Sequence, residues 1–266
     1  MNILESIGGE MIRSLAYVGG LTNQFLGGLR ASVRILPLVG NRRRWKAAIV
    51  QMSAIGVEAL PMIAIMAMCA GFILAMQGGA ELRRFGALRY VTDLVAIGFT
   101  RELGPLLTAI VVSGRSASAF SAEIGTMMVT NEIDALRVMS LDPVEFVLSP
   151  KYVAAIVTVP CLTIMTSAFG ILAGAGFMYL STKMTLLIYL RCVASSIVLR
   201  DVLTGLVKSL AFATIIVHVG CLEGFRVQGG PDAVGRSATA AVVKSTFLVI
   251  LADLFFTGIF YMAGVE

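Results

Sequence analysis

The side chains in this sequence that could do chemistry are mostly ionisable residues placed inside long apolar runs. The set comprises Glu58, Arg101, Glu102, Lys208, His218, Lys244 and Asp253. A charge is costly in hydrocarbon, so such residues either line the path of a polar substrate or pair with one another. Arg101 and Glu102 would point about 100° apart on a helix, so they need not pair with each other. Two interpretations stay open: both residues shape a cavity, or charges elsewhere in the apolar runs neutralise them. The candidates for neutralisation are Glu58, Lys208 and Asp253.

Catalytic and cofactor-binding patterns are missing from the sequence. It contains no GxxxxGK[ST] string to cradle a nucleotide phosphate and no legible Ser/His/Asp set. His218, the single histidine, is better explained as a helix-packing residue than as a base. The four cysteines are scattered without CxxC spacing, so no metal site is indicated; they are Cys69, Cys161, Cys192 and Cys221. We therefore expect no catalysis, metal or bound cofactor in this polypeptide.

The composition is that of a membrane protein. Of the 266 residues, 58% are hydrophobic and 14% are charged, against about 25% charged in soluble domains. The mean hydropathy is +0.89. The net charge of +5 comes partly from NRRRWK, residues 41–46, just before the first apolar run. That placement suits a topology signal or an anionic-lipid contact, and no basic face with interleaved aromatics indicates nucleic-acid binding.

The apolar runs predict an all-α integral membrane protein with five transmembrane helices. The expected spans are residues 48–77, 92–118, 151–180, 201–222 and 237–263, within one five-span domain of residues 47–266. Residues 1–46 are patterned as an amphipathic helix, broken by glycine pairs, that lies in the membrane interface. With the N-terminus in the cytoplasm, cytoplasmic segments carry about twice as many Lys and Arg residues as the others, which also places the C-terminus outside.

One polar stretch, residues 114–146, interrupts the apolar chain between spans two and three. Asp142-Pro143-Val144-Glu145 reads as a helix N-cap followed by proline, and Ser149-Pro150 repeats this start signal. Upstream, Thr130 or Asn131 can cap a short helix with acidic residues in its first turn. We expect a short amphipathic helix held under the membrane. Contact with a soluble partner is favoured over simple adsorption to an anionic leaflet.

Two short motifs echo each other. GRSASA begins at Gly114 and Arg115, and GRSATA begins at Gly235 and Arg236. Their small residues would let helix backbones approach closely at the cytoplasmic face, and each arginine could meet lipid headgroups or a partner's carboxylates. Chance similarity is the alternative for so short a string.

Several longer motifs resemble one known family over nearly the whole chain. They are RELGP at 101–105, SGRSASAFSAEIGTM at 113–127, EIDAL at 132–136, LDP at 141–143, SPK at 149–151, LVKSLAFA at 206–213 and LADLFFTG at 251–258. The sequence is similar to the MlaE (YrbE) type permeases, the membrane subunits of bacterial ABC lipid transporters that work with MCE proteins. The resemblance implies a multi-pass protein of the bacterial inner membrane that moves phospholipid.

The resemblance also assigns roles to particular residues. The cytoplasmic segment 121–146 would be the coupling helix that docks on a separate ATPase, which binds the ATP and Mg. Its coupling residues are Glu123, Thr130, Glu132, Ile133, Asp134, Leu136 and Arg137. The lipid cavity would lie at the interface of a permease homodimer, with an MCE-protein ring on the outer side. From their placement near the outer face, its lining is Leu74, Met76, Gln77, Leu94, Ile97 and Gly98, joined by Arg101 and Glu102 in RELGP.

Other classes of function stay open. An ion-coupled secondary carrier would use Glu58, Glu102, Lys208 and Asp253, and its transport would survive without an ATPase. A membrane scaffold without transport would use the same charges only to join helices. An integral-membrane lipid enzyme is disfavoured, because no nucleophile or metal constellation is present.

Overall fold

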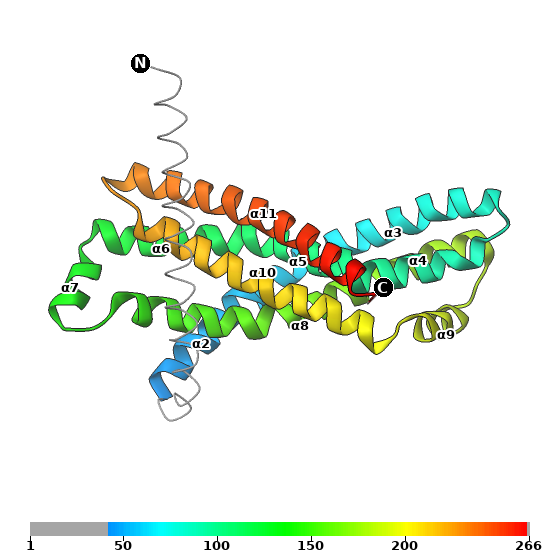
Figure 1. The fold of residues 1–266 in the computed structure, drawn as a ribbon, viewed down its shortest axis with the longest axis horizontal. Coiled ribbons are helices and arrows are strands. Elements are labelled where there is room, and N and C mark those ends of the chain that lie inside the picture. The colour runs from blue at the N-terminus through cyan, green and yellow to red at the C-terminus, as the bar shows by residue number, and fades with distance from the viewer. Residues whose placement is uncertain (1–41, 265–266) are drawn as a thin grey trace, which may run out of the picture.

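The computed structural model describes residues 42–264, and all its regular structure in that range is helical (Figure 1). The predicted interfacial helix, residues 1–46, lies almost wholly outside the described residues. Five helical stretches are long and apolar enough to cross a membrane, which confirms the all-α, five-span prediction. They are Trp45–Arg84, Leu88–Val129, Phe146–Thr182, Leu199–Phe225 and Pro231–Met262.

Span one is broken into two helices near its start. Helix α2 (Arg42–Ile55) and helix α3 (Leu60–Arg84) are joined by a 3₁₀ turn, Val57–Ala59. Pro61 lies in the first turn of α3, where its missing N–H costs no hydrogen bond. The break therefore falls beside Pro61, a residue type that commonly lies at helix kinks.

Span two is one long helical stretch whose turns change pitch twice. It contains η3 (Leu88–Tyr90), α4 (Val91–Gly98), η4 (Phe99–Leu103), α5 (Gly104–Val112), η5 (Ser113–Ala117) and α6 (Ser118–Val129). The segments η4 and η5 are π-helical turns. The helix continues to Val129, beyond the predicted end at 118, so the first part of the expected coupling segment belongs to α6.

Span three belongs to the longest helix, α8 (Pro143–Thr182). Asp142 is its N-cap and accepts a 2.9 Å hydrogen bond from the backbone N–H of Val144, as the sequence predicts. The prediction of a second helix start at Ser149-Pro150 is wrong, because Pro150 lies inside α8. Buried neighbours on both sides, Leu148 and Tyr152, pack into the core, which holds the helix together across the proline.

The connection between spans three and four contains a helix that the sequence analysis did not predict, α9 (Leu186–Ser196). Its buried Tyr189 donates a 3.1 Å hydrogen bond to the carbonyl oxygen of Ile171 on α8, and burial raises the pKa of this phenol to about 12. Ser196 hydrogen-bonds Asp93 on α4. These contacts fasten α9 to spans two and three.

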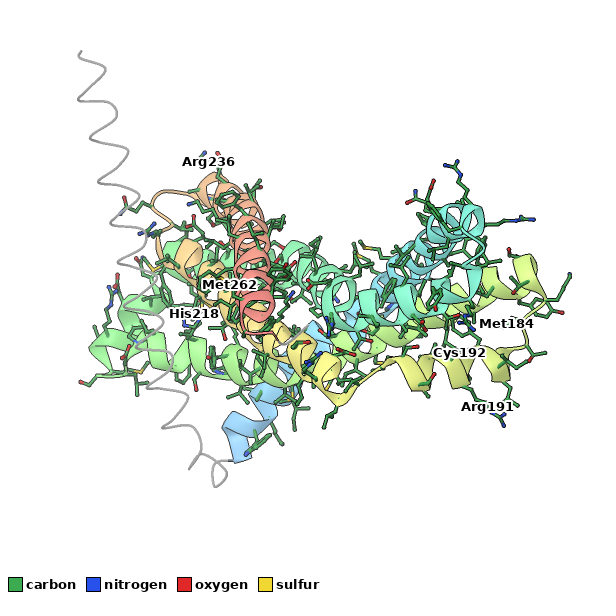
Figure 2. All side chains as sticks on the ribbon, turned by 45° about the vertical axis from the view of Figure 1, so that its right-hand side comes forward. Met184, Arg191, Cys192, His218, Arg236 and Met262 are labelled. Atoms are coloured by element: carbon green, nitrogen blue, oxygen red, sulfur yellow. The ribbon has the colours of Figure 1, made fainter. Side chains whose placement is uncertain are left out.

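The last two spans are helix α10 (Leu199–Phe225) and helix α11 (Pro231–Met262). Among the five spans, α10 is the most buried and α11 the least. α11 packs along α10 and α6, whereas α3 packs along α8, so the two helices lie on different sides of the molecule (Figure 2). A Cβ at Gly71 on α3 would overlap the carbonyl oxygen of Gly170 on α8, so these backbones cross in direct contact.

The molecule has two ends along its length, which we name after the short helices they carry (Figure 1). The α7 end contains α7 (Glu132–Val138), the end of α6 and the start of α8. The α9 end contains α9 and the turn between α3 and α4. One apolar core cluster, which includes Ile133 and Phe212, extends to the α7 end, and a second, which includes Phe99 and Tyr189, lies toward the α9 end.

Candidate functional site

A network of charged side chains joins spans two, four and five inside the apolar part of the bundle. Lys208 on α10 is 1% exposed and lies at its centre. Its ammonium nitrogen is 3.0 Å from Asp253 Oδ1 on α11 and forms an ion pair with Glu102 on span two. It also donates a 2.8 Å hydrogen bond to the hydroxyl of Thr257. Two carboxylates and one ammonium therefore share a site between spans two, four and five.

A second ion pair lies beside this network. Arg101 Nε is 2.7 Å from Asp201 Oδ1, and the Asp201 side chain is almost fully buried. Asp201 and Lys208 are seven residues apart on α10, so they lie on the same helix face. Arg101 reaches Asp201 on that face, and Glu102 reaches Lys208. Of the candidates for neutralisation, only Lys208 pairs with Glu102, and Asp253 contacts Lys208. Arg101 pairs with Asp201, which was not a candidate, and Glu58 pairs with Arg115.

The helical turn that carries Arg101 and Glu102 has an unusual shape with a clear cause. Pro105 cannot donate a backbone hydrogen bond, and its ring would clash with the carbonyl four residues earlier, that of Arg101. The chain widens into the π turn η4 immediately before it. The carbonyl of Phe99 accepts both the N–H of Gly104 and the hydroxyl of Ser167 on α8, the latter at 3.1 Å. Such π turns are frequent at functional sites.

Glu102 is not sealed within its network. Its side chain is 37% exposed, whereas that of its partner Lys208 is 1% exposed. The carboxylate therefore presents one side to the surroundings of the bundle while the other side is tied to span four. This is the exposed charge that could meet a polar group of a substrate inside the membrane region.

The residues predicted to line a lipid cavity lie on α3 and α4, on the α9 side of this network. Leu74 approaches Gly98, and Leu94 packs over Gly78, so the two helices meet through these positions. Met76, Gln77 and Leu94 are exposed, and Ile97 is half-buried. The structure brings Leu74, Gly98 and the Arg101–Glu102 turn into one region, while Met76 and Gln77 point to the outside of this chain.

The polar segment after span two forms the short helix α7, which begins after Asn131 in the left-handed conformation, at φ 59°. No side-chain oxygen caps its N-terminus; the Thr130 hydroxyl instead donates to the Glu132 carboxylate at 3.1 Å. Asp134 and Arg137 form an exposed ion pair of 2.8 Å on the outer side. The acidic face of α7 is therefore presented to solvent.

The apolar side of α7 is used within the chain. Ile133 and Leu136 are buried in the core cluster with Val147 and Leu148 of α8. They hold α7 in place and do not face a partner. The exposed apolar side chains of this connection come later: Val138 is 86% exposed, and Met139 and Leu141 are exposed too. Sequence reasoning did not single out Val138 or Leu141, because a seven-residue helix gives too little periodicity to assign its faces.

Glu123 lies on α6, away from the exposed face of α7. Its carboxylate is 2.7 Å from the ammonium of Lys151 on α8, which is almost fully buried. Sequence reasoning did not identify Lys151 as a site residue. The available signal was a single lysine at the start of an otherwise uncharged span.

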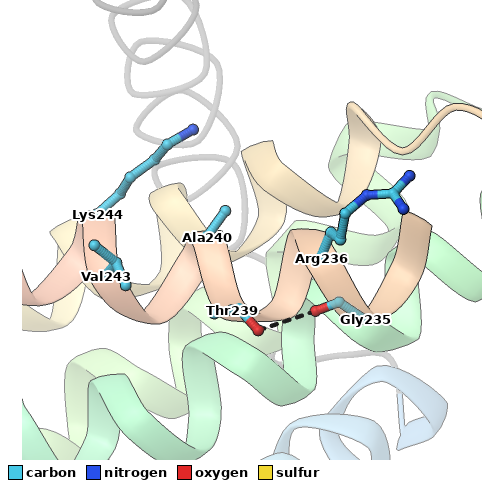
Figure 3. A pocket seen from close by; sticks show the side chains of 6 residues that line it. All are labelled: Gly235, Arg236, Thr239, Ala240, Val243 and Lys244. Atoms are coloured by element: carbon cyan, nitrogen blue, oxygen red, sulfur yellow. Dashed lines mark hydrogen bonds between the residues drawn. The ribbon is translucent and has the colours of Figure 1, made fainter. Parts of the chain in front are cut away.

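The two small-residue motifs have different environments. Arg115 is in the π turn η5 and forms an ion pair with Glu58 of span one. Arg236 is exposed near the start of α11. It lines an open hollow of about 540 Å³ together with Gly235, Thr239, Ala240, Val243 and Lys244 (Figure 3). Both glycines face open space, so neither allows a close helix contact. Ser121 and Ser237, however, hydrogen-bond at 3.1 Å, so α6 and α11 do meet near the motifs.

His218 on α10 packs as a structural residue. It is buried, its Nδ1 lies 2.7 Å from the carbonyl oxygen of Thr214, and its ring meets that of Tyr152 edge-on at 5.5 Å. Within residues 42–264, no group of three or more His, Cys, Asp or Glu side chains could hold a metal ion.

The fold and site define a multi-pass α-helical membrane protein with charged ties between its spans and a short charged helix at one end. The family model "Permease MlaE" matches residues 48–259, and the chain belongs to this permease family. It is 33% identical to a probable ABC transporter permease protein of Rickettsia bellii, with 98% of both chains covered. A probable ABC transporter permease protein of Synechocystis is 35% identical over 79% of this chain and 80% of the relative. The intermembrane phospholipid transport system permease protein MlaE of Haemophilus influenzae is 28% identical over 99% of both chains.

Proposed function

We propose that this chain is the permease subunit of an ABC transporter that moves phospholipid, driven by a separate ATPase that binds α7. The family membership and the name of the Haemophilus influenzae relative support the substrate class. The observation that carries the ATPase contact is the structure of α7. Its apolar side is anchored inside the chain, and its charged side, with Asp134 and Arg137, is free for another molecule.

In this proposal the α7 end faces the cytoplasm. The basic residues of 41–46 and the excess of Lys and Arg in the segments on that side favour this orientation. The N-terminus is then cytoplasmic, and the C-terminus lies on the periplasmic side of a bacterial inner membrane. ATP and Mg would bind to the ATPase, and this chain would bind neither.

The path of motion follows from the packing. Because Ile133 and Leu136 fix α7 to the core formed with α6 and α8, a force on α7 is transmitted to spans two and three. Span two carries the π turn with Arg101 and Glu102, which ion pairs tie to spans four and five. Movement of span two would therefore change how it packs against spans four and five, and would expose or cover a lipid site.

Exposed surfaces support the positions proposed for the remaining partners. The least buried span, α11, together with α3, presents apolar faces that a second copy of the permease and lipid acyl chains would cover. The lipid would lie beside Leu74, Gly98 and Glu102. An MCE protein would meet the α9 end, where lipid leaves or enters the membrane protein.

An ion-coupled carrier is the second candidate function, because one observation favours it. Glu102 keeps an exposed side while its other side contacts Lys208, which is the arrangement of a carboxylate that exchanges partners. This candidate predicts lipid movement that continues without ATP hydrolysis and responds to an ion gradient.

The deciding experiment is reconstitution of the permease with its ATPase in vesicles of phosphatidylethanolamine and phosphatidylglycerol. Transfer of a fluorescent phospholipid to an added MCE protein is measured with ATP and with a non-hydrolysable analogue. The proposal expects transfer only when ATP is hydrolysed, and the Glu102→Ala variant should lose transfer while it still assembles. Transfer that is equal under both nucleotides would contradict the proposal, and stimulation by a proton or sodium gradient would favour the carrier.

A further inference from the structure

A buried lysine lies at the base of the hairpin formed by α6, α7 and α8. Lys151 is 2% exposed, although it is only eight residues from the start of α8. Its ammonium contacts the carboxylate of Glu123 at 2.7 Å and lies 5.4 Å from the ring centre of Phe120, and both partners are on α6. The cation is therefore held by one helix while its backbone belongs to another.

The Glu123–Lys151 pair flanks α7 in the sequence, so it can affect how a movement of α7 reaches spans two and three. Glu123 comes nine residues before α7 begins, and Lys151 comes thirteen residues after α7 ends. Ile133 and Leu136 of α7 belong to the same buried core cluster as Phe120, the aromatic neighbour of Lys151. The Glu123–Lys151 pair thus joins spans two and three just behind the helix on which a partner would push.

Because Lys151 is buried, its contact with Glu123 favours one alignment of α6 relative to α8. A buried ammonium without a carboxylate is strongly unfavourable, so the two helices are stable only in the register that brings Glu123 to Lys151. Helices α6 and α8 both pack along α10, and apolar packing on a shared neighbour sets no preferred direction for sliding of one helix past the other. The ion pair and the aromatic ring together oppose such sliding.

We propose that Lys151 is a positioning residue, which locks the ends of spans two and three into one unit so that displacement of α7 moves both spans together. This inference rests on the proposed function, in which an ATPase acts on α7. It assigns Glu123 to the transmission of motion within this chain instead of to direct contact with the ATPase.

The test compares Lys151→Met and Lys151→Arg in the purified complex with its ATPase, in the vesicles described above. Three quantities are measured: ATPase bound per permease, ATP hydrolysed, and phospholipid transferred per ATP hydrolysed. Lys151→Met is expected to keep bound ATPase and hydrolysis but to lower transfer per ATP by about fivefold or more, the scale of a typical coupling between sites. Lys151→Arg should restore most of the transfer, because its guanidinium can pair with Glu123.

A matched control is available at the same end of the molecule. Lys244 on α11 contacts both carboxylate oxygens of Glu223 on α10 at 2.9 Å, and this pair does not involve the hairpin. Lys244→Met removes an ion pair of similar length between two other spans. Its transfer per ATP should stay near the wild-type value if the hairpin pair is what matters.

The outcomes separate the inference from the proposed function. An assembled Lys151→Met complex with wild-type transfer per ATP would overturn the inference. If that variant fails to fold, Glu123→Gln replaces it, since the Glu123 side chain is half exposed. Wild-type transfer per ATP in Glu123→Gln overturns the inference equally. A wild-type permease that binds no ATPase would instead remove the proposed function itself.

Discussion

The charges inside the spans and the charges on α7 are arranged in opposite ways. Lys208 and Asp201 are almost fully buried, and each pairs with a residue about a hundred positions away on another span. On α7, Asp134 pairs with Arg137 three residues along the same helix, and both side chains stay more than half exposed. The first arrangement ties helices together, whereas the second leaves charge available to another molecule.

This difference separates two kinds of polar residue that composition alone treats alike. A buried pair is costly to break, because the remaining charge has neither water nor a partner. An exposed pair on one helix adds little stability, because water already solvates both groups. Substitution of Lys208 or Asp201 should therefore act on folding, and substitutions on α7 should act on partner binding.

The largest effect is expected for Lys208→Met. The change removes the cation from between Glu102 and Asp253, and leaves two carboxylates facing each other in the membrane region. Loss of a partner from a buried ion pair costs about 3–5 kcal/mol. Thermal unfolding in detergent should show a clearly lowered transition. An unchanged transition would mean that the network does not hold spans two, four and five together.

The next effect is expected for Asp201→Asn. The amide oxygen can still accept the backbone N–H of Val198, which Asp201 Oδ2 accepts at 2.9 Å, but it no longer neutralises Arg101. A cost of about 1–3 kcal/mol follows from leaving a partly buried guanidinium without its carboxylate. A double-mutant cycle with Arg101→Gln measures the coupling. Additive effects of the two substitutions would show that this contact is not important for stability.

A smaller effect on stability is expected for the arginines of the GRSASA and GRSATA motifs, and it should differ between the two. Arg115→Gln should destabilise the protein, by about 1 kcal/mol, because it breaks the pair that joins spans one and two; Glu58 is largely exposed, so the loss is modest. Arg236→Gln should leave unfolding unchanged, since Arg236 is exposed on an open face of α11. The two variants are compared by unfolding in the same detergent, and equal destabilisation would contradict the different environments.

The smallest effect on stability, with the largest effect on binding, is expected for the double variant Glu132→Lys and Asp134→Lys. Both residues are exposed, so unfolding should change by about 0.5 kcal/mol or less. Co-purification with the ATPase should fall sharply, because the sign of the presented face is reversed. Unchanged co-purification would place the ATPase contact elsewhere, for example on Val138 and Met139.

The spans were predictable from the sequence, because hydropathy and length are local properties of the chain. The N-cap at Asp142 and the break near Pro61 were predictable for the same reason. The partner of Arg101 was not, since the pairing depends on how spans two and four pack. Pro150 misled the prediction because tertiary packing overrides a local helix-start signal.

Two further features needed the structure. Helix α9 was missed because its eleven residues are too short for a span and too apolar for an ordinary connection. The burial of Ile133 and Leu136 was missed because the sequence shows that they share a face but not what that face meets. Which side of α7 is free for a partner is a property of the packed hairpin.

The most direct test of the central claim is native mass spectrometry of the complex extracted gently from its own membrane. We expect a particle that contains two copies of this chain, two copies of an ATPase and bound phospholipid, and that loses the ATPase when Glu132 and Asp134 are changed to lysine. A particle that contains this chain and phospholipid but no ATPase, under conditions that preserve other membrane complexes, would contradict the assignment of α7 as the site where the transporter is driven.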